Sequence, residues 1–170
     1  MGHRANFVVI QQGSALAYFD DWAGLGAAFA VADGPAVAIA SLEEFSPTTA
    51  LLDWAFAEGG FLLDMDEKVL IVFGELDDPL DDFDDFDDDD AEQEDLAACG
   101  DDVVDDESSS VQAYTEYFRQ IAGKWQGWSL RYDDRGVDAF AEQLQRRGIT
   151  SIAWQEPSHP ESCQQLVVQA

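Results

Sequence analysis

The order of apolar and polar residues along the chain predicts two β-hairpins. Residues Ala5 to Gln11 are rich in β-branched and large apolar side chains, Gln12-Gly13-Ser14 is typical of a turn, and the pattern resumes from Ala15 to Phe19. A second pair of strands is predicted at Phe61 to Asp64 and Val69 to Phe73. The uninterrupted apolar run of Val69 to Phe73 indicates a central, fully buried strand.

Apolar residues at helical spacing predict five helices: Trp22 to Ala32, Ala36 to Phe45, Leu51 to Phe56, Ser108 to Lys124 and Val137 to Arg147. Ser46-Pro47-Thr48 is interpreted as the start signal of the third helix. Further strands are expected at Gln126 to Tyr132, Ile149 to Trp154 and Gln165 to Val168. Hairpins and helices are segregated rather than strictly alternating. We therefore expect an α+β fold, an antiparallel sheet built from hairpins with helices packed on one side.

One segment interrupts this pattern. From Glu75 to Glu107 the chain has nineteen acidic residues and no basic one. The expected organisation is a single domain over residues 1–170, with residues 75–107 as an acidic insertion between a core strand and a core helix. Asp is a poor helix former, and like charges four residues apart repel each other. We expect the insertion to be loosely ordered unless a partner binds it.

The centre of the insertion is the candidate partner-binding site. It consists of Asp81, Asp82, Phe83, Asp84, Asp85, Phe86, Asp87, Asp88, Asp89 and Asp90. In a helix its charges would recur every ~1.9 Å, close to the ~1.7 Å of double-stranded DNA. In an extended segment they would recur every ~4 Å, near the spacing of a single strand, so the carboxylate spacing does not fix the conformation. Such a block repels nucleic acid and anionic membranes and attracts basic surfaces, including clefts that hold nucleic acid.

Three interpretations of the insertion stay open. It is a solubilising loop, a docking surface for a basic protein, or a weak cation-binding segment. Solubility alone does not require Phe83 and Phe86 within the acid run. Residues 84–90 lack the glycine and glutamate that a calcium loop needs, so no structural metal site is expected.

Composition points to a globular, cytoplasmic protein. The chain has 170 residues, 46% of them hydrophobic, with five tryptophans, which is enough for a packed core. Its net charge is −28, and the residues outside the insertion carry 17 acids against 8 bases. No signal-peptide core follows the first residues, and no apolar run approaches the roughly 18 residues of a membrane span. Cys99 and Cys163 are expected to be a reduced pair.

Little in the sequence favours catalysis. His159 lies in a proline-bracketed turn, and its spacing to Cys163 forms only a weak dyad without supporting groups. His3, Arg4 and Asn6 could hold an anion or cap the sheet. The sequence has no phosphate-binding glycine loop, zinc-ligand set or nucleophile elbow, so we expect neither an enzyme nor a cofactor.

Large aromatics stand beside acids at Asp20-Asp21-Trp22 and at Asp53-Trp54. Most large aromatics are expected in the core. One left exposed next to carboxylates would anchor a bound protein, because aromatic residues concentrate interface energy.

Three stretches resemble uncharacterised bacterial proteins with the same opening: Gly2 to Val8, Leu52 to Gly60 and Asp64 to Lys68, within roughly the first 75 residues. In charge and size the chain also resembles the acidic immunity proteins that bacteria pair with nuclease toxins. The resemblance implies an inhibitor that occludes a basic, nucleic-acid-targeting toxin or enzyme through a nucleic-acid-mimicking surface. The alternative is an acidic, chaperone-like module that binds a basic protein without inhibiting it.

Overall fold

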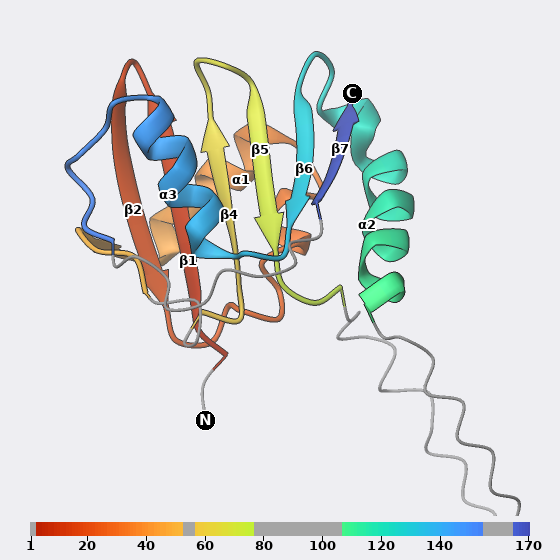
Figure 1. Cartoon of the computed structure of the whole chain (residues 1–170), viewed down its shortest axis with the longest axis horizontal. Helices are drawn as coiled ribbons and strands as arrows, with labels where there is room; N and C mark the ends of the chain where they lie inside the picture. The colour runs from red at the N-terminus through yellow and green to blue at the C-terminus, as the bar shows by residue number, and fades with distance from the viewer. Residues whose placement is uncertain (1–2, 53–56, 77–106, 155–164) are drawn as a thin grey trace, which may run out of the picture.

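The computed structural model describes residues 3–52, 57–76, 107–154 and 165–170 (Figure 1). In this part of the chain seven strands form one mixed sheet in the order β3-β2-β1-β4-β5-β6-β7. The strands are β1 (Ala5–Gln11), β2 (Ser14–Asp20), β3 (Ser46–Thr48), β4 (Gly59–Asp64), β5 (Val69–Phe73), β6 (Ser129–Asp133) and β7 (Gln165–Gln169). The helices are α1 (Pro35–Ser41), α2 (Glu107–Ile121) and α3 (Val137–Arg146), with short 3-10 helices η1 (Phe29–Val31), η2 (Leu42–Glu44) and η4 (Ala122–Lys124).

Both predicted hairpins are present. β1 pairs antiparallel with β2 up to Gln11 opposite Ser14, and β4 pairs antiparallel with β5. Gln12 and Gly13, which join β1 to β2, both have positive φ angles of 53° and 73°. This is the backbone pattern of a tight two-residue hairpin turn, in which both central residues are left-handed.

The expectation of a purely antiparallel sheet is wrong. β1 lies parallel to β4, and β5 lies parallel to β6. A parallel neighbour requires a crossover connection rather than a tight turn. The segment containing α1 makes the first crossover, and the segment ending in α2 makes the second.

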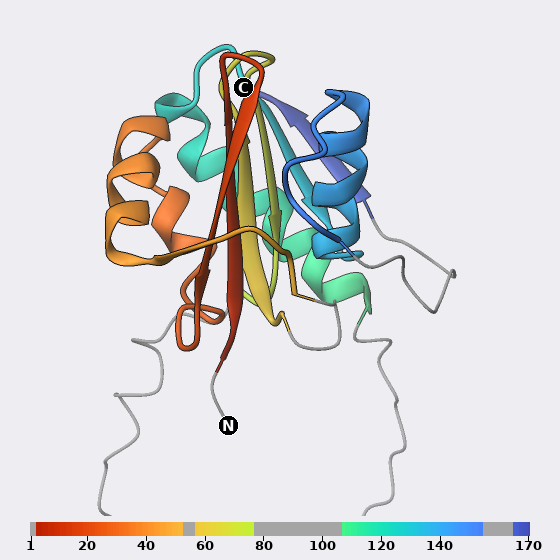
Figure 2. The ribbon, with the colours of Figure 1, turned by 90° about the vertical axis from the view of Figure 1, so that its left-hand side faces the viewer.

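The expectation that the helices pack on one side is also wrong. α1 and α2 contribute Ala38, Tyr114 and Phe118 to one core cluster, whereas α3 contributes Phe140 and Leu144 to another on the opposite face. Figure 2 shows the sheet on edge with α1 on one side and α3 on the other. Two-sided cover follows from the central strands, which are apolar on both faces.

Three local predictions are corrected. Trp22 to Ala32 forms turns followed by η1 rather than a helix. Its backbone packs tightly on the start of β1, where a Cβ on Gly24 would lie 2.8 Å from the His3 carbonyl oxygen. Residues 46–48 form the edge strand β3 rather than a helix start, and an edge strand tolerates Pro47 because one row of its backbone groups is unpaired. The helix predicted at residues 51–56 has no regular structure at 51–52, and residues 53–56 lie outside the described part.

The strand predicted at Ile149 to Trp154 is not formed. This segment contributes one isolated bridge, Ala153 with Ala50, instead of a strand. The other predicted helices and strands agree with the structure within a few residues, with α2 continuing into η4 and α3 ending before Gly148.

The sheet has two chemically different ends. We call the end where β1 and β4 begin, and where β2, β5 and β6 finish, the acidic end; it is the lower end in Figure 1. The opposite end carries the β1–β2 and β4–β5 turns and the last turn of α3.

Candidate functional site

The predicted partner-binding residues Asp81 to Asp90 lie outside the described residues. The described chain does include both places where the acidic insertion joins the folded domain. One follows β5 at the acidic end, and the other is the beginning of α2. The candidate site therefore consists of these two junctions and the side chains around them.

The two junctions are tied to each other and to the core. The Tyr114 hydroxyl of α2 donates a hydrogen bond of 3.0 Å to the carbonyl oxygen of Gly74, one residue beyond β5. The Tyr114 ring stacks on Tyr132 of β6 at 4.2 Å, and Leu76 packs against the same core cluster. Burial, followed by the nearby Tyr132 and Tyr117, raises the pKa of Tyr114, so this hydroxyl stays a neutral donor.

Three glycines hold the acidic end together by close backbone contact. A Cβ on Gly59, at the start of β4, would lie 2.1 Å from the carbonyl oxygen of Gly24. A Cβ on Gly74 would lie 2.9 Å from the Cα of Gly59. Side chains cannot occupy these positions without moving the backbone. The turn after β2 is thereby held against the strand from which the acidic insertion departs.

Carboxylates gather around this junction. The acidic end carries Asp20, Asp21, Glu58, Glu75, Asp133 and Asp134 against Arg4, Arg131 and Arg135. The opposite end is balanced, with Asp33, Asp64, Asp66 and Glu67 against Lys68, Lys124, Arg146 and Arg147. Of the two ends of the sheet, the one where the insertion of like charge is attached is therefore the negative one.

The arginines are engaged inside the folded domain. Each of the six has a carboxylate of the described residues within 4 Å. Arg135 is the clearest case, because it contacts buried Asp133 at 2.7 Å and Glu142 at 2.8 Å. The hydrogen bond to Asp133 is the main cause that raises the pKa of Arg135.

The polar cluster at the opposite end has a structural role. Buried Asp64 accepts hydrogen bonds from the backbone N–H groups of Asp66 and Glu67 and, at 2.8 Å, from Gln143 of α3. Arg147 lies 3.4 Å from the same carboxylate and contacts Glu67 at 3.2 Å. This cluster joins the β4–β5 turn to the end of α3.

His3, Arg4 and Asn6 do not form the single group that the sequence suggested. His3 Nδ1 lies 2.6 Å from Glu58 Oε2, and Arg4 lies 3.7 Å from Asp21. Asn6 is buried, accepts a 2.7 Å hydrogen bond from the Leu52 N–H and donates to the Tyr18 carbonyl. Asn6 therefore joins segments of the core, and only His3 and Arg4 reach the acidic surface. Sequence separation concealed the His3–Glu58 contact, which the parallel pairing of β1 with β4 creates.

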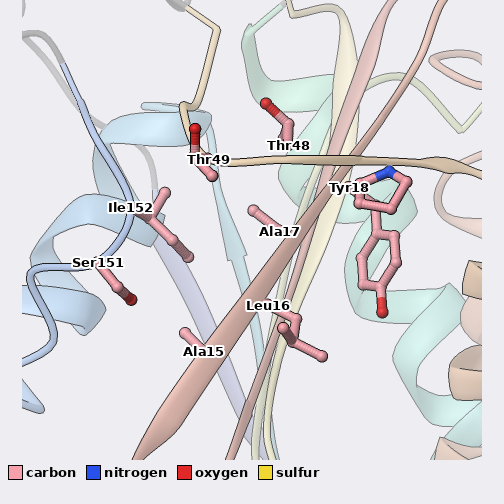
Figure 3. Close-up of a pocket in the computed structure, with 9 residues that line it drawn as sticks. Ala15, Leu16, Ala17, Tyr18, Thr48, Thr49, Ser151 and Ile152 are labelled. Carbon is pink, nitrogen blue, oxygen red and sulfur yellow. The ribbon is translucent and has the colours of Figure 1, made fainter.

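An uncharged groove lies apart from the acidic residues. It has a volume of about 630 Å³ and follows β2 where β3 stops covering it. Figure 3 labels eight of the residues that line it, Ala15, Leu16, Ala17, Tyr18, Thr48, Thr49, Ser151 and Ile152, and Pro47 completes the lining. No lining residue is ionisable except Tyr18, so the groove supplies no charge for acid–base or metal chemistry.

Within the described residues no group of three or more His, Cys, Asp or Glu side chains is placed to hold a metal ion. None of the described helices is long and apolar enough to cross a membrane. Cys99, His159 and Cys163 lie outside the described part.

The chain matches no protein-family model, no curated protein and no solved structure.

Proposed function

We propose that the chain is an immunity protein, or inhibitor, that binds and occludes a basic bacterial toxin or enzyme acting on nucleic acid. The observation that carries the proposal is a charge imbalance between the acidic insertion and the bases of the folded domain. Residues 77–106 contain seventeen acids and no base, while every arginine of the chain already has a carboxylate partner in the folded domain. A basic partner would supply the countercharge for this segment.

The position of the insertion supports the same function. Both of its junctions are fixed to the core, through the Tyr114–Gly74 hydrogen bond and the packing of Leu76. The nearby carboxylates of the acidic end extend its negative field. A segment tethered at both ends loses less conformational freedom on binding than a free tail does.

The mechanism is occlusion of a phosphate-binding cleft. Carboxylates of Asp81 to Asp90 occupy the positions that phosphates would take, and Phe83 and Phe86 fill apolar pockets beside them. The acidic field accelerates the encounter with a basic partner. Neither a cofactor nor contact with nucleic acid or a membrane is part of this function, and we place it in the cytoplasm.

The test is the rate of association with a basic protein that the chain captures in an affinity pull-down. We expect the rate constant to fall at least about ten-fold between low ionic strength and about 0.5 M salt. Replacing Asp84, Asp85, Asp87 and Asp88 with Asn should weaken binding. A rate that does not change with salt, together with unchanged binding of the variant, would remove the insertion from the mechanism.

A second function is favoured by the same charge observation, namely a chaperone-like module that shields a basic protein without inhibiting it. The activity of the partner in the complex separates the two, because an inhibitor abolishes it and a shielding module leaves it intact. An enzymatic role would depend on His3, which Glu58 orients. Catalysis that is lost in a folded His3→Ala variant would support that role instead.

A further inference from the structure

Trp22 is the most exposed large apolar side chain among the described residues. It is 71% exposed, whereas Trp125 and Trp128 lie in the core. Tryptophan is usually largely buried because exposure of its ring to water is costly. Leu25, three residues further along the same turn, is also exposed.

The backbone beneath Trp22 is fixed. Asp20 Oδ1 accepts hydrogen bonds from the N–H groups of Trp22 at 2.7 Å and Ala23 at 2.8 Å. The Gly24 N–H donates to the His3 carbonyl oxygen at 2.7 Å, and the contact of Gly24 with Gly59 closes the turn against β4. The indole is thus presented from a rigid support, which lowers the ordering cost of binding through it.

The charges around Trp22 define what can cover it. The turn lies at the acidic end, beside exposed Asp21 and Glu58 and next to the strand that leads into the acidic insertion. A second copy of the chain, also carrying a charge of −28, would be repelled. An arginine side chain satisfies both features, because its flat guanidinium group stacks on an aromatic face while its N–H groups donate to carboxylates.

We propose that Trp22 and Asp21 form a guanidinium-binding surface that receives an arginine of the basic partner, beside the contact made by the acidic insertion. The inference rests on the proposed function for the origin of the arginine, and on the Trp22 turn for its geometry. Asp21 already has a weak partner of this kind, since Arg4 Nε lies 3.7 Å from its carboxylate. The incoming arginine replaces or joins Arg4 there.

The experiment uses the full chain, labelled with ¹⁵N, and two peptides of equal charge, tetra-arginine and tetra-lysine. The Trp22 indole N–H signal is assigned as the one lost in Trp22→Ala. We expect it to shift with tetra-arginine at about three-fold lower peptide concentration than with tetra-lysine, because guanidinium stacks on the ring better than ammonium does. Asp21→Asn should raise the concentration needed.

The internal control is Trp125, whose buried indole donates to the Val31 carbonyl at 2.8 Å and should not respond. A Trp22 signal that does not move, or that moves equally with both peptides, would overturn the inference. The peptide experiment and the inhibition assay can fail independently of each other. Failure of the chain to inhibit the basic partner, with an arginine-selective Trp22 shift, would remove the inhibitor function and leave the surface standing.

Discussion

At the scale of single residues, Asp66 joins the two hairpin turns. Its carboxylate accepts hydrogen bonds from the N–H groups of Gln12 at 2.8 Å and Gly13 at 2.9 Å, and it also contacts Arg147 at 2.5 Å. These are the two residues whose left-handed backbone makes the β1–β2 turn. The hydrogen bonds from Gly13 and Gln12 are the main causes that lower the pKa of Asp66 below its ordinary value of 3.8.

This shift predicts a pH-dependent contribution to stability. A carboxyl whose pKa is lowered by folding stabilises the native state above its unfolded pKa and ceases to do so as pH falls through the folded value. Asp66→Asn should therefore destabilise the protein at neutral pH, with the difference from the parent chain closing as pH is lowered below 3.8. Urea unfolding of both proteins at each pH measures this difference, with exposed Asp21→Asn as the control. A difference that does not depend on pH would contradict the assignment.

The exposure of Trp22 could not be predicted from the sequence. The presence of acids beside Trp22 is visible in the sequence, and its exposure is what the structure adds. Gly24 and Gly59 bring the backbones of distant segments together beside the Trp22 turn, and no local sequence pattern records this contact.

At the scale of elements, close packing of the turn after β2 on β4 depends on the absence of a side chain at Gly59. Gly59→Ala places a Cβ 2.1 Å from the Gly24 carbonyl oxygen and should destabilise the fold by about 2–3 kcal/mol. Gly26→Ala is the matched control, because nothing lies within 4 Å of the position its Cβ would take. Thermal unfolding compares the two variants. Equal transition temperatures would show that the glycine contact does not hold the acidic end together.

The hairpins were predictable because turn residues and adjacent strands are local in sequence. The parallel pairs β1–β4 and β5–β6 were not, because no local turn residue specifies which strands distant in sequence become neighbours. The sequence does contain one signal of cover on both faces of the sheet. Phe61, Leu62 and Leu63 are consecutive and all buried, and such a run indicates a strand covered on both faces, which requires a helix on each side.

At the scale of the whole molecule, the two ends of the sheet differ in net charge. The end with the Asp66 cluster is balanced, and the end that holds Trp22 and the junctions of the insertion is negative. The acidic insertion is readable from composition alone, and composition is also what leads us to propose a basic partner. The carboxylates around the junctions of the insertion cannot be predicted from composition. Asp20, Glu58 and Glu75 come to the same end of the sheet only because β2, β4 and β5 align there.

The most direct test of the central claim compares two variants that lose the same charge. Asp84→Asn/Asp85→Asn removes two charges from the insertion, and Glu43→Gln/Glu44→Gln removes two from exposed positions around η2. Stopped-flow association with the basic partner at low ionic strength should be slowed about ten-fold by the first and less than about two-fold by the second. Equal slowing by both would mean that only net charge matters and would contradict a binding role for the insertion.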